Sequence, residues 1–208
     1  MILYLLQGIT LALSATIMPG PLQAFLISYA LKNGWKRTLP AAFAPIMTDG
    51  PILAVVLFLL TQTSQWFLDM LRIAGGLFIL YLARGIFLTF RQSGPTLEHN
   101  EGVARKGFFS AIAINALNPN PYIFWSVVGG PIILSGWRDS ATLGITFLAA
   151  FFGTFVCGLA ALILLFGTAG RLDTKISWIL SAIAFVALLI FGLYQIVVGI
   201  MAFIQFAD

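Results

Sequence analysis

The sequence predicts an all-α membrane protein with six transmembrane helices, arranged as two inverted three-helix repeats with broken helices 1 and 4. Of its 208 residues, 60% are hydrophobic and only 9% are charged, whereas a soluble domain has about 25% charged residues. The apolar residues form successive runs long enough to cross a bilayer, which takes about 20 residues per helix. A motif with two prolines occurs in the first run and again in the fourth.

The predicted spans follow one another with little sequence between them. Spans 1 to 3 cover roughly residues 2–30, 39–61 and 67–90, and spans 4 to 6 cover roughly residues 107–134, 141–166 and 177–206. The one extended polar segment, residues 91–106, is a linker between two halves, residues 1–90 and 107–208. Because each half has an odd number of spans, the two halves cross the membrane in opposite directions, as inverted repeats do.

The positive charges predict the orientation of the chain in the membrane. Most of them fall in loops 1–2, 3–4 and 5–6, namely Lys32, Lys36, Arg37, Arg91, Arg105, Lys106, Arg171 and Lys175. The positive-inside rule places these loops in the cytoplasm and both termini outside. We therefore expect a multi-pass protein of the cell (inner or plasma) membrane. Four tryptophans at span ends fit an interfacial aromatic belt: Trp35, Trp66, Trp137 and Trp178.

The proline motifs are Pro19-Gly20-Pro21 in span 1 and Asn118-Pro119-Asn120-Pro121 in span 4. A proline inside a helix costs about 3 kcal/mol, so two in each of two matching spans indicate a function. Aligning the motifs pairs the first prolines with each other and the second prolines with each other. The alternative is six spans with coincidental prolines, since proline is commoner in membrane helices than in soluble ones.

Each proline removes an N–H group from the helix and so frees the carbonyl four residues earlier. The carbonyls expected to be free are those of Ala15, Ile17, Asn115 and Leu117. Each helix can then restart, with Gly20 or Asn120 as N-cap and the next proline at the first helical position. Free carbonyls beside free N–H groups suit a solute with a cationic and an anionic group, such as an amino acid. A small anion with a coupling cation would fit equally.

Asp49 lies inside span 2, at a depth of roughly 16 Å at 1.5 Å per residue. An ionised carboxylate there costs about 2.5–3.5 kcal/mol on insertion scales. Such a residue is expected to hold a cationic group of a solute or to carry a proton. The alternative is a neutral, structural aspartate bonded to nearby hydroxyl groups such as that of Thr48.

The candidate substrate-binding residues gather at the two breaks and at this carboxylate. Gln23 lies one turn after the first break, and Asn115 and Asn118 flank the second. The full set is Pro19, Gly20, Pro21, Gln23, Asp49, Asn115, Asn118, Pro119 and Asn120.

Enzymatic function is not favoured, because the sequence has no HExxH motif, Walker A loop or GxSxG elbow. One histidine and one cysteine argue against a soft-metal site. We expect no catalytic residue, no metal and no cofactor. The cysteine, Cys157, is expected to be a buried, inert thiol. Gly75, Gly76, Gly153, Gly192 and Gly199 are expected to let helices pack closely.

Taken together, these motifs resemble those of the lysine-exporter superfamily, the LysE/RhtB-type amino-acid exporters. The matching features are Pro19-Gly20-Pro21, the acidic Asp49, the run from Gly75-Gly76 to Leu80-Tyr81-Leu82, and Leu117-Asn118-Pro119. Two features differ: the lysine that follows Asn-Pro in the family is Asn120 here, and the glycines before the acidic residue are replaced by Ala44, Pro45 and Thr48. The resemblance implies export of a small amino acid or derivative, driven by an ion gradient.

The leading hypothesis is therefore a secondary exporter of amino acids or similar small polar solutes. One alternative is a hard-cation exporter of the same broad superfamily, because a carboxylate among carbonyls would make an oxygen-rich site. The other is a membrane assembly protein without transport activity. The expected partners are a small-molecule substrate and the lipid bilayer, with no nucleic acid, and a homodimer is compatible with the sequence.

Overall fold

The structure, a computed structural model, describes residues 1–18, 20–59, 70, 73–81, 83–84, 101–172 and 174–205. These residues are helical or lie in short connections, and none of them forms a strand. Three of the described helical stretches are long and apolar enough to cross a membrane, namely Trp35–Leu57, Ala141–Thr168 and Phe185–Ala202, and a bent helix pair is a fourth candidate. The chain is therefore a multi-pass membrane protein. The predicted third span lies mostly outside the described residues, so the number of six spans stays a prediction.

The first predicted span is two helices rather than one. Helix α1 (Ile2–Ile17) and helix α2 (Pro21–Asn33) meet at an angle of 64°. Between them, Gly20 has an extended backbone with φ −150° and ψ 172°, and Pro21 occupies the first turn of α2. The predicted break at this motif is thus confirmed.

Helix α2 ends at Gly34, whose φ of 81° favours glycine over any residue with a Cβ atom. The chain then reverses into α3 (Trp35–Thr38), the 3₁₀ turn η1 (Leu39–Phe43) and α4 (Ala44–Leu59). Pro51 lies inside α4 without ending it. Together these elements form the second predicted span.

The fourth predicted span is also interrupted. It begins with α6 (Glu101–Ala116) and continues as α7 (Pro119–Phe124), the π-helical turn η2 (Trp125–Gly129) and α8 (Gly130–Asp139). Because α6 starts at Glu101, the last part of the predicted polar linker is helical. Two long helices, α9 (Ala141–Leu172) and α10 (Thr174–Gln205), complete the chain.

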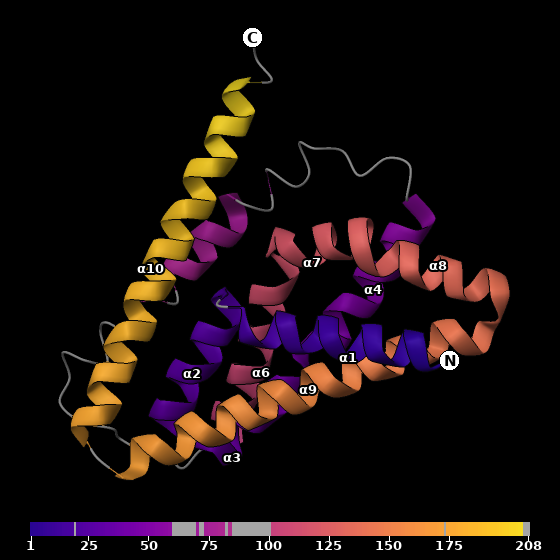
Figure 1. Cartoon of the computed structure of the whole chain (residues 1–208). Helices are drawn as coiled ribbons and strands as arrows, with labels where there is room; N and C mark the ends of the chain where they lie inside the picture. Colours follow the sequence, from indigo (N-terminus) through magenta and orange to yellow (C-terminus); the bar gives the residue numbers. More distant parts are fainter. Residues whose placement is uncertain are drawn as a thin grey trace.

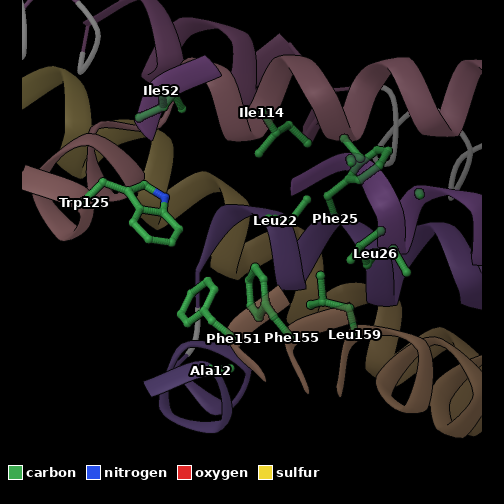
Figure 2. Packing of buried hydrophobic residues seen from close by; sticks show 14 of the residues in the cluster. Ala12, Leu22, Phe25, Leu26, Ile52, Ile114, Trp125, Phe151, Phe155 and Leu159 are labelled. Atoms are coloured by element: carbon green, nitrogen blue, oxygen red, sulfur yellow. The ribbon is translucent and has the colours of Figure 1, made fainter. Parts of the chain in front are cut away.

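Helix α9 is the scaffold on which the N-terminal half packs. It runs along α1 and also contacts α2 and α8, while α10 packs against α2 at the edge of the molecule (Figure 1). The main core lies where α2, α6, α9 and η2 come together (Figure 2). Its largest fully buried side chains are aromatic: Trp125, Phe147 and Phe151. This core surrounds the polar groups described below.

Glycines set the closest helix contacts. A Cβ atom on Gly8 would lie 2.7 Å from the carbonyl oxygen of Phe147, so α1 touches the backbone of α9 there. A Cβ on Gly76 would lie 2.7 Å from the carbonyl oxygen of Gly192, which confirms the expected close packing at both residues. The same expectation is wrong for Gly153, where no atom lies within 4 Å of a Cβ position.

The expectation that Cys157 is buried is also wrong. This residue lies on the exposed face of α9. Because α9 packs through its opposite face onto α1 and α2, a small apolar side chain at this position needs no partner within the protein and suits contact with lipid.

We predict that Gly8→Ala lowers the stability of the protein, because the added methyl group meets backbone atoms of α9 that cannot move aside. Overpacking of this kind costs about 1–3 kcal/mol. Gly153→Ala is the matched control: its methyl group meets nothing, and alanine is the better helix former by about 1 kcal/mol. Thermal unfolding in detergent should show a lower Tm for Gly8→Ala only. An equal loss in both variants would contradict the observed packing.

Candidate functional site

A cluster of buried polar side chains joins α4 to α6. Asp49 in α4 is 4% exposed and Asn115 in α6 is 5% exposed. The Asn115 Nδ2 group donates to Asp49 Oδ1 at 2.6 Å and to Thr48 Oγ1 at 2.6 Å. The sequence is thus folded so that a carboxylate of the first half is held by an amide of the second half.

The local backbone explains how Thr48 reaches this position. Its hydroxyl lies 3.2 Å from the carbonyl oxygen of Ala44, 3.3 Å from that of Pro45 and 3.3 Å from Asp49 Oδ1. A threonine inside a helix commonly bonds back to the preceding turn in this way. The hydroxyl is therefore fixed beside the carboxylate, with its oxygen turned towards the Asn115 amide.

In the described part of the chain, the surroundings of Asp49 contain hydrogen-bond donors but no opposite charge. Among the described residues, the side chains that act on its carboxyl group are those of Thr48, Asn115 and Trp125, and none of them is cationic. A carboxylate in an apolar segment such as Trp35–Leu57 is costly unless it is paired or hydrogen-bonded. Thr48 and Asn115 supply hydrogen bonds, and the carboxyl group can still take one positive charge or one proton.

Trp125 is the member of the cluster that the sequence analysis did not identify. It is 0% exposed, and its indole N–H lies beside the Asp49 carboxyl group without a hydrogen-bond partner. One signal in the sequence could have marked it: it lies in the interior of predicted span 4, whereas the other four tryptophans lie at span ends. A tryptophan in that position needs an explanation other than the membrane interface.

The first break is closed by a side chain. The Gln23 Nε2 group donates to the carbonyl oxygen of Ala15 at 2.9 Å, which is one of the carbonyls that the prolines were expected to free. The other end of the amide lies over Gly20, where a Cβ atom would be 2.9 Å from Gln23 Oε1. Gln23, predicted to bind substrate, here holds the two halves of the broken helix together.

The second break is capped two residues earlier than predicted. Asn118, with φ −83° and ψ 125°, is the N-cap of α7, and its side-chain oxygen accepts the N–H of Asn120 at 3.1 Å. The prediction of Asn120 as N-cap is therefore wrong: Pro119, not Pro121, occupies the first helical position. Asn118 can cap because its own backbone is extended, whereas Asn120 already lies within the first turn of α7.

The carbonyls at this break are also used within the protein. The N–H of Asn118 donates to the carbonyl oxygen of Asn115 at 3.2 Å, so that group, expected to be free, is bonded. The Tyr122 hydroxyl donates to the carbonyl oxygen of Ala116 at 2.9 Å. A Cβ on Gly75 would run into the Leu117 carbonyl, so glycine lets the chain pass close to the break.

The two breaks correspond more closely in structure than in sequence. A helix precedes each of them, α1 before the first and α6 before the second. An extended residue, Gly20 or Asn118, follows each helix and caps the next one, which starts with Pro21 or Pro119. This pairs Pro21 with Pro119 and replaces the pairing expected from the motifs alone.

The structure brings together only part of the predicted substrate-binding set. Asp49 and Asn115 are bonded, and the buried Asn118 and Pro119 lie close by because α4 also packs on α7. The side chain of Asn120 is exposed. The remaining residues belong to the first break, on the helix α2 that packs against α6: Gly20, Pro21 and Gln23. Pro19 lies outside the described residues.

The described residues contain no group of three or more His, Cys, Asp or Glu side chains that could hold a metal ion. The site as built can bind one cationic group at Asp49, or exchange one proton there, and can offer amide and hydroxyl groups to a neighbouring polar atom.

Comparison with known proteins gives a match to one family model. A family model described as LysE type translocator matches residues 13–205, which is nearly the whole sequence and includes both breaks, Asp49 and Asn115. Searches of curated proteins and of solved structures found no match.

We predict that Asn118→Ala destabilises the protein by about 0.5–2 kcal/mol, the usual cost of removing an N-cap side chain. Asn118→Ser is the control at the same position, because serine caps about as well as asparagine. Thermal unfolding of the purified protein should give Tm values in the order wild type, Ser, Ala. If the Ser and Ala variants were equally unstable, the side-chain cap would not be what stabilises the second break.

Proposed function

Since the chain belongs to the LysE type translocator family, we propose that it is a secondary transporter that exports amino acids or similar small polar solutes across the cytoplasmic membrane. The observation that carries this proposal is the buried Asp49–Asn115 contact between α4 and α6. It puts a hydrogen-bonded carboxylate, with no cationic side chain bonded to it among the described residues, inside an apolar helix bundle and next to a helix break.

Charge decides which part of a solute this site prefers. A buried carboxylate is far more costly than a neutral polar group, and a nearby cation offsets much of that cost. The ammonium group of an amino acid is such a cation. Asn115 and Thr48 can form hydrogen bonds with the other polar atoms of the amino acid. A solute with a positive group and a second polar group is thus the best fit.

The carboxylate also supports coupling to an ion gradient. Asp49 is the one acidic side chain that is buried among the described residues, and such groups in membrane segments are typical of proton relays. Asp49 would bind a proton in one half of the transport cycle and the ammonium group of the solute in the other. The proton and the solute would then exclude each other at this one site. That exclusion is the basis of antiport, in which proton entry drives solute export.

Two structural correspondences support the inverted-repeat arrangement of the transporter. Helices α1 and α6 each end at a break, and the helix that follows each break starts with a proline. In secondary transporters, discontinuous helices in inverted repeats meet at the substrate site. We propose that the two breaks here are equivalent elements of such repeats, with residues 1–90 and 107–208 as the two halves, residues 91–106 in the cytoplasm and both termini outside.

We predict that Asp49→Asn abolishes export while the protein still folds. The amide has the shape of the carboxylate but can neither attract an ammonium group nor carry a proton. Export of radiolabelled amino acids from loaded proteoliposomes, driven by an imposed pH gradient, measures the effect, and we expect a loss of at least about 10-fold, the effect of about 1.4 kcal/mol. Asp139→Asn is the control, because Asp139 is an exposed carboxylate at the end of α8.

Normal export by Asp49→Asn, with an unchanged Tm, would mean that the proposed site is wrong. No export of any of the twenty amino acids by the wild type would reject the proposed substrate class.

A further inference from the structure

The π-helical turn η2 contains two buried polar atoms that have no hydrogen-bond partner, Trp125 Nε1 and Ser126 Oγ. More than nine in ten buried polar groups in proteins are hydrogen-bonded, so each exception calls for an explanation. A short π-helical turn inside an α-helix is itself rare and is frequent at functional sites. Unpaired groups and unusual backbone therefore occur together, directly after the second helix break.

The Trp125 ring is held firmly by its neighbours. Its centroid lies 5.1 Å from that of Phe151 and 5.7 Å from that of Phe152, both on α9. Gly129 leaves room for the ring, since a Cβ atom there would run into it. In Figure 2 the indole nitrogen lies on the edge of the ring that faces Ile52 of α4. The N–H is thus fixed in direction but unpaired.

The acceptor that lies beside this N–H is the carboxyl group of Asp49, one helical turn before Ile52. That carboxyl group is already bonded to the Asn115 amide. The carboxylate on α4 therefore has a donor on each side of the second break. Asn115 belongs to α6 before the break, and Trp125 belongs to η2 after it.

We propose that Trp125 is a positioning residue of the solute site, whose indole N–H takes over the Asp49 carboxylate from the Asn115 amide when solute binds. The released Asn115 amide then donates to the carboxylate or another polar oxygen of the solute, while its cationic group binds Asp49. This proposal rests on the proposed function, because it assigns the group that binds the polar oxygen of the solute in the same site.

The exchange is favourable on both sides. In the observed state the Trp125 N–H is buried without a partner, and the Asn115 amide is fully used. After the exchange, the N–H has an acceptor and the amide has the solute, so neither of these two donors is left unpaired. The movement involves η2, which already packs against α4. Solute binding would thereby be transmitted to α8, which follows η2 directly.

The test is the indole ¹⁵N–¹H NMR signal of Trp125 in protein reconstituted in nanodiscs. The chain has five tryptophans, so the signal is assigned by its loss in Trp125→Phe. Independently, it is the indole signal that remains in a variant with the other four tryptophans replaced by phenylalanine. The probe is an equimolar mixture of the twenty L-amino acids. We expect the Trp125 signal to move downfield when the mixture is added, as an N–H does on gaining an acceptor, while the signal of the exposed Trp137 stays in place.

Transport gives a second readout. Trp125→Phe keeps the aromatic packing but loses the N–H, so we expect its maximal export rate to fall roughly 10-fold or more, as for one hydrogen bond to a charged group. Its Tm should stay close to that of the wild type. Trp137→Phe, the matched control, should export normally.

The outcomes separate this proposal from the proposed function. If the mixture raises the Tm of the wild type but not that of Asp49→Asn, and the Trp125 signal does not move, the proposal is overturned and the proposed function stands. If the mixture neither stabilises the protein nor is exported, both are rejected. If Trp125→Phe does not fold, the wild-type signal in the presence of the mixture still decides between the two results.

Discussion

The contact between Asp49 and Asn115 is the interaction on which the rest of the structure depends. A carboxylate inside an apolar helix bundle must be hydrogen-bonded or paired, or its helix will not insert. The pair meets this requirement across the two halves of the chain, with Asn115 on α6 holding the carboxylate of α4. The need to keep this group satisfied, while leaving it able to accept a cation or a proton, explains why polar side chains concentrate around one position.

The same requirement governs the helix breaks. Backbone groups freed by proline have no water to bond in a membrane and must find partners in the protein. Gln23 donates to a carbonyl oxygen at the first break, and Tyr122 donates to one at the second. The Asn118 side chain accepts a backbone N–H at the second break. These side chains stabilise bent helices that would otherwise be too costly. A bend held by side chains rather than by continuous backbone hydrogen bonds can also change its angle, which a transport cycle requires.

The sequence predicted those features that depend on the chemistry of single residues. A proline breaks a helix wherever it lies, and a lone carboxylate in an apolar run needs partners, so the two breaks, Asp49 and its hydroxyl neighbour Thr48 could be identified. Features that depend on packing could not be identified from the sequence. The choice between Asn118 and Asn120 as N-cap depends on which N–H the side chain reaches, and the role of Trp125 depends on how η2 packs against α4 and α9. Gly153 looked like a packing glycine but faces no neighbour.

The central claim, that Asp49 is where solute binds, can be tested by chemical protection. An apolar carbodiimide modifies protonated carboxyl groups in membrane segments, and mass spectrometry of the peptide that contains Asp49 measures the rate of modification. The account predicts that the amino-acid mixture slows modification of Asp49 and leaves that of the exposed Asp139 unchanged. Modification of Asp49 at the same rate with and without amino acids, under conditions in which the protein transports them, would contradict it.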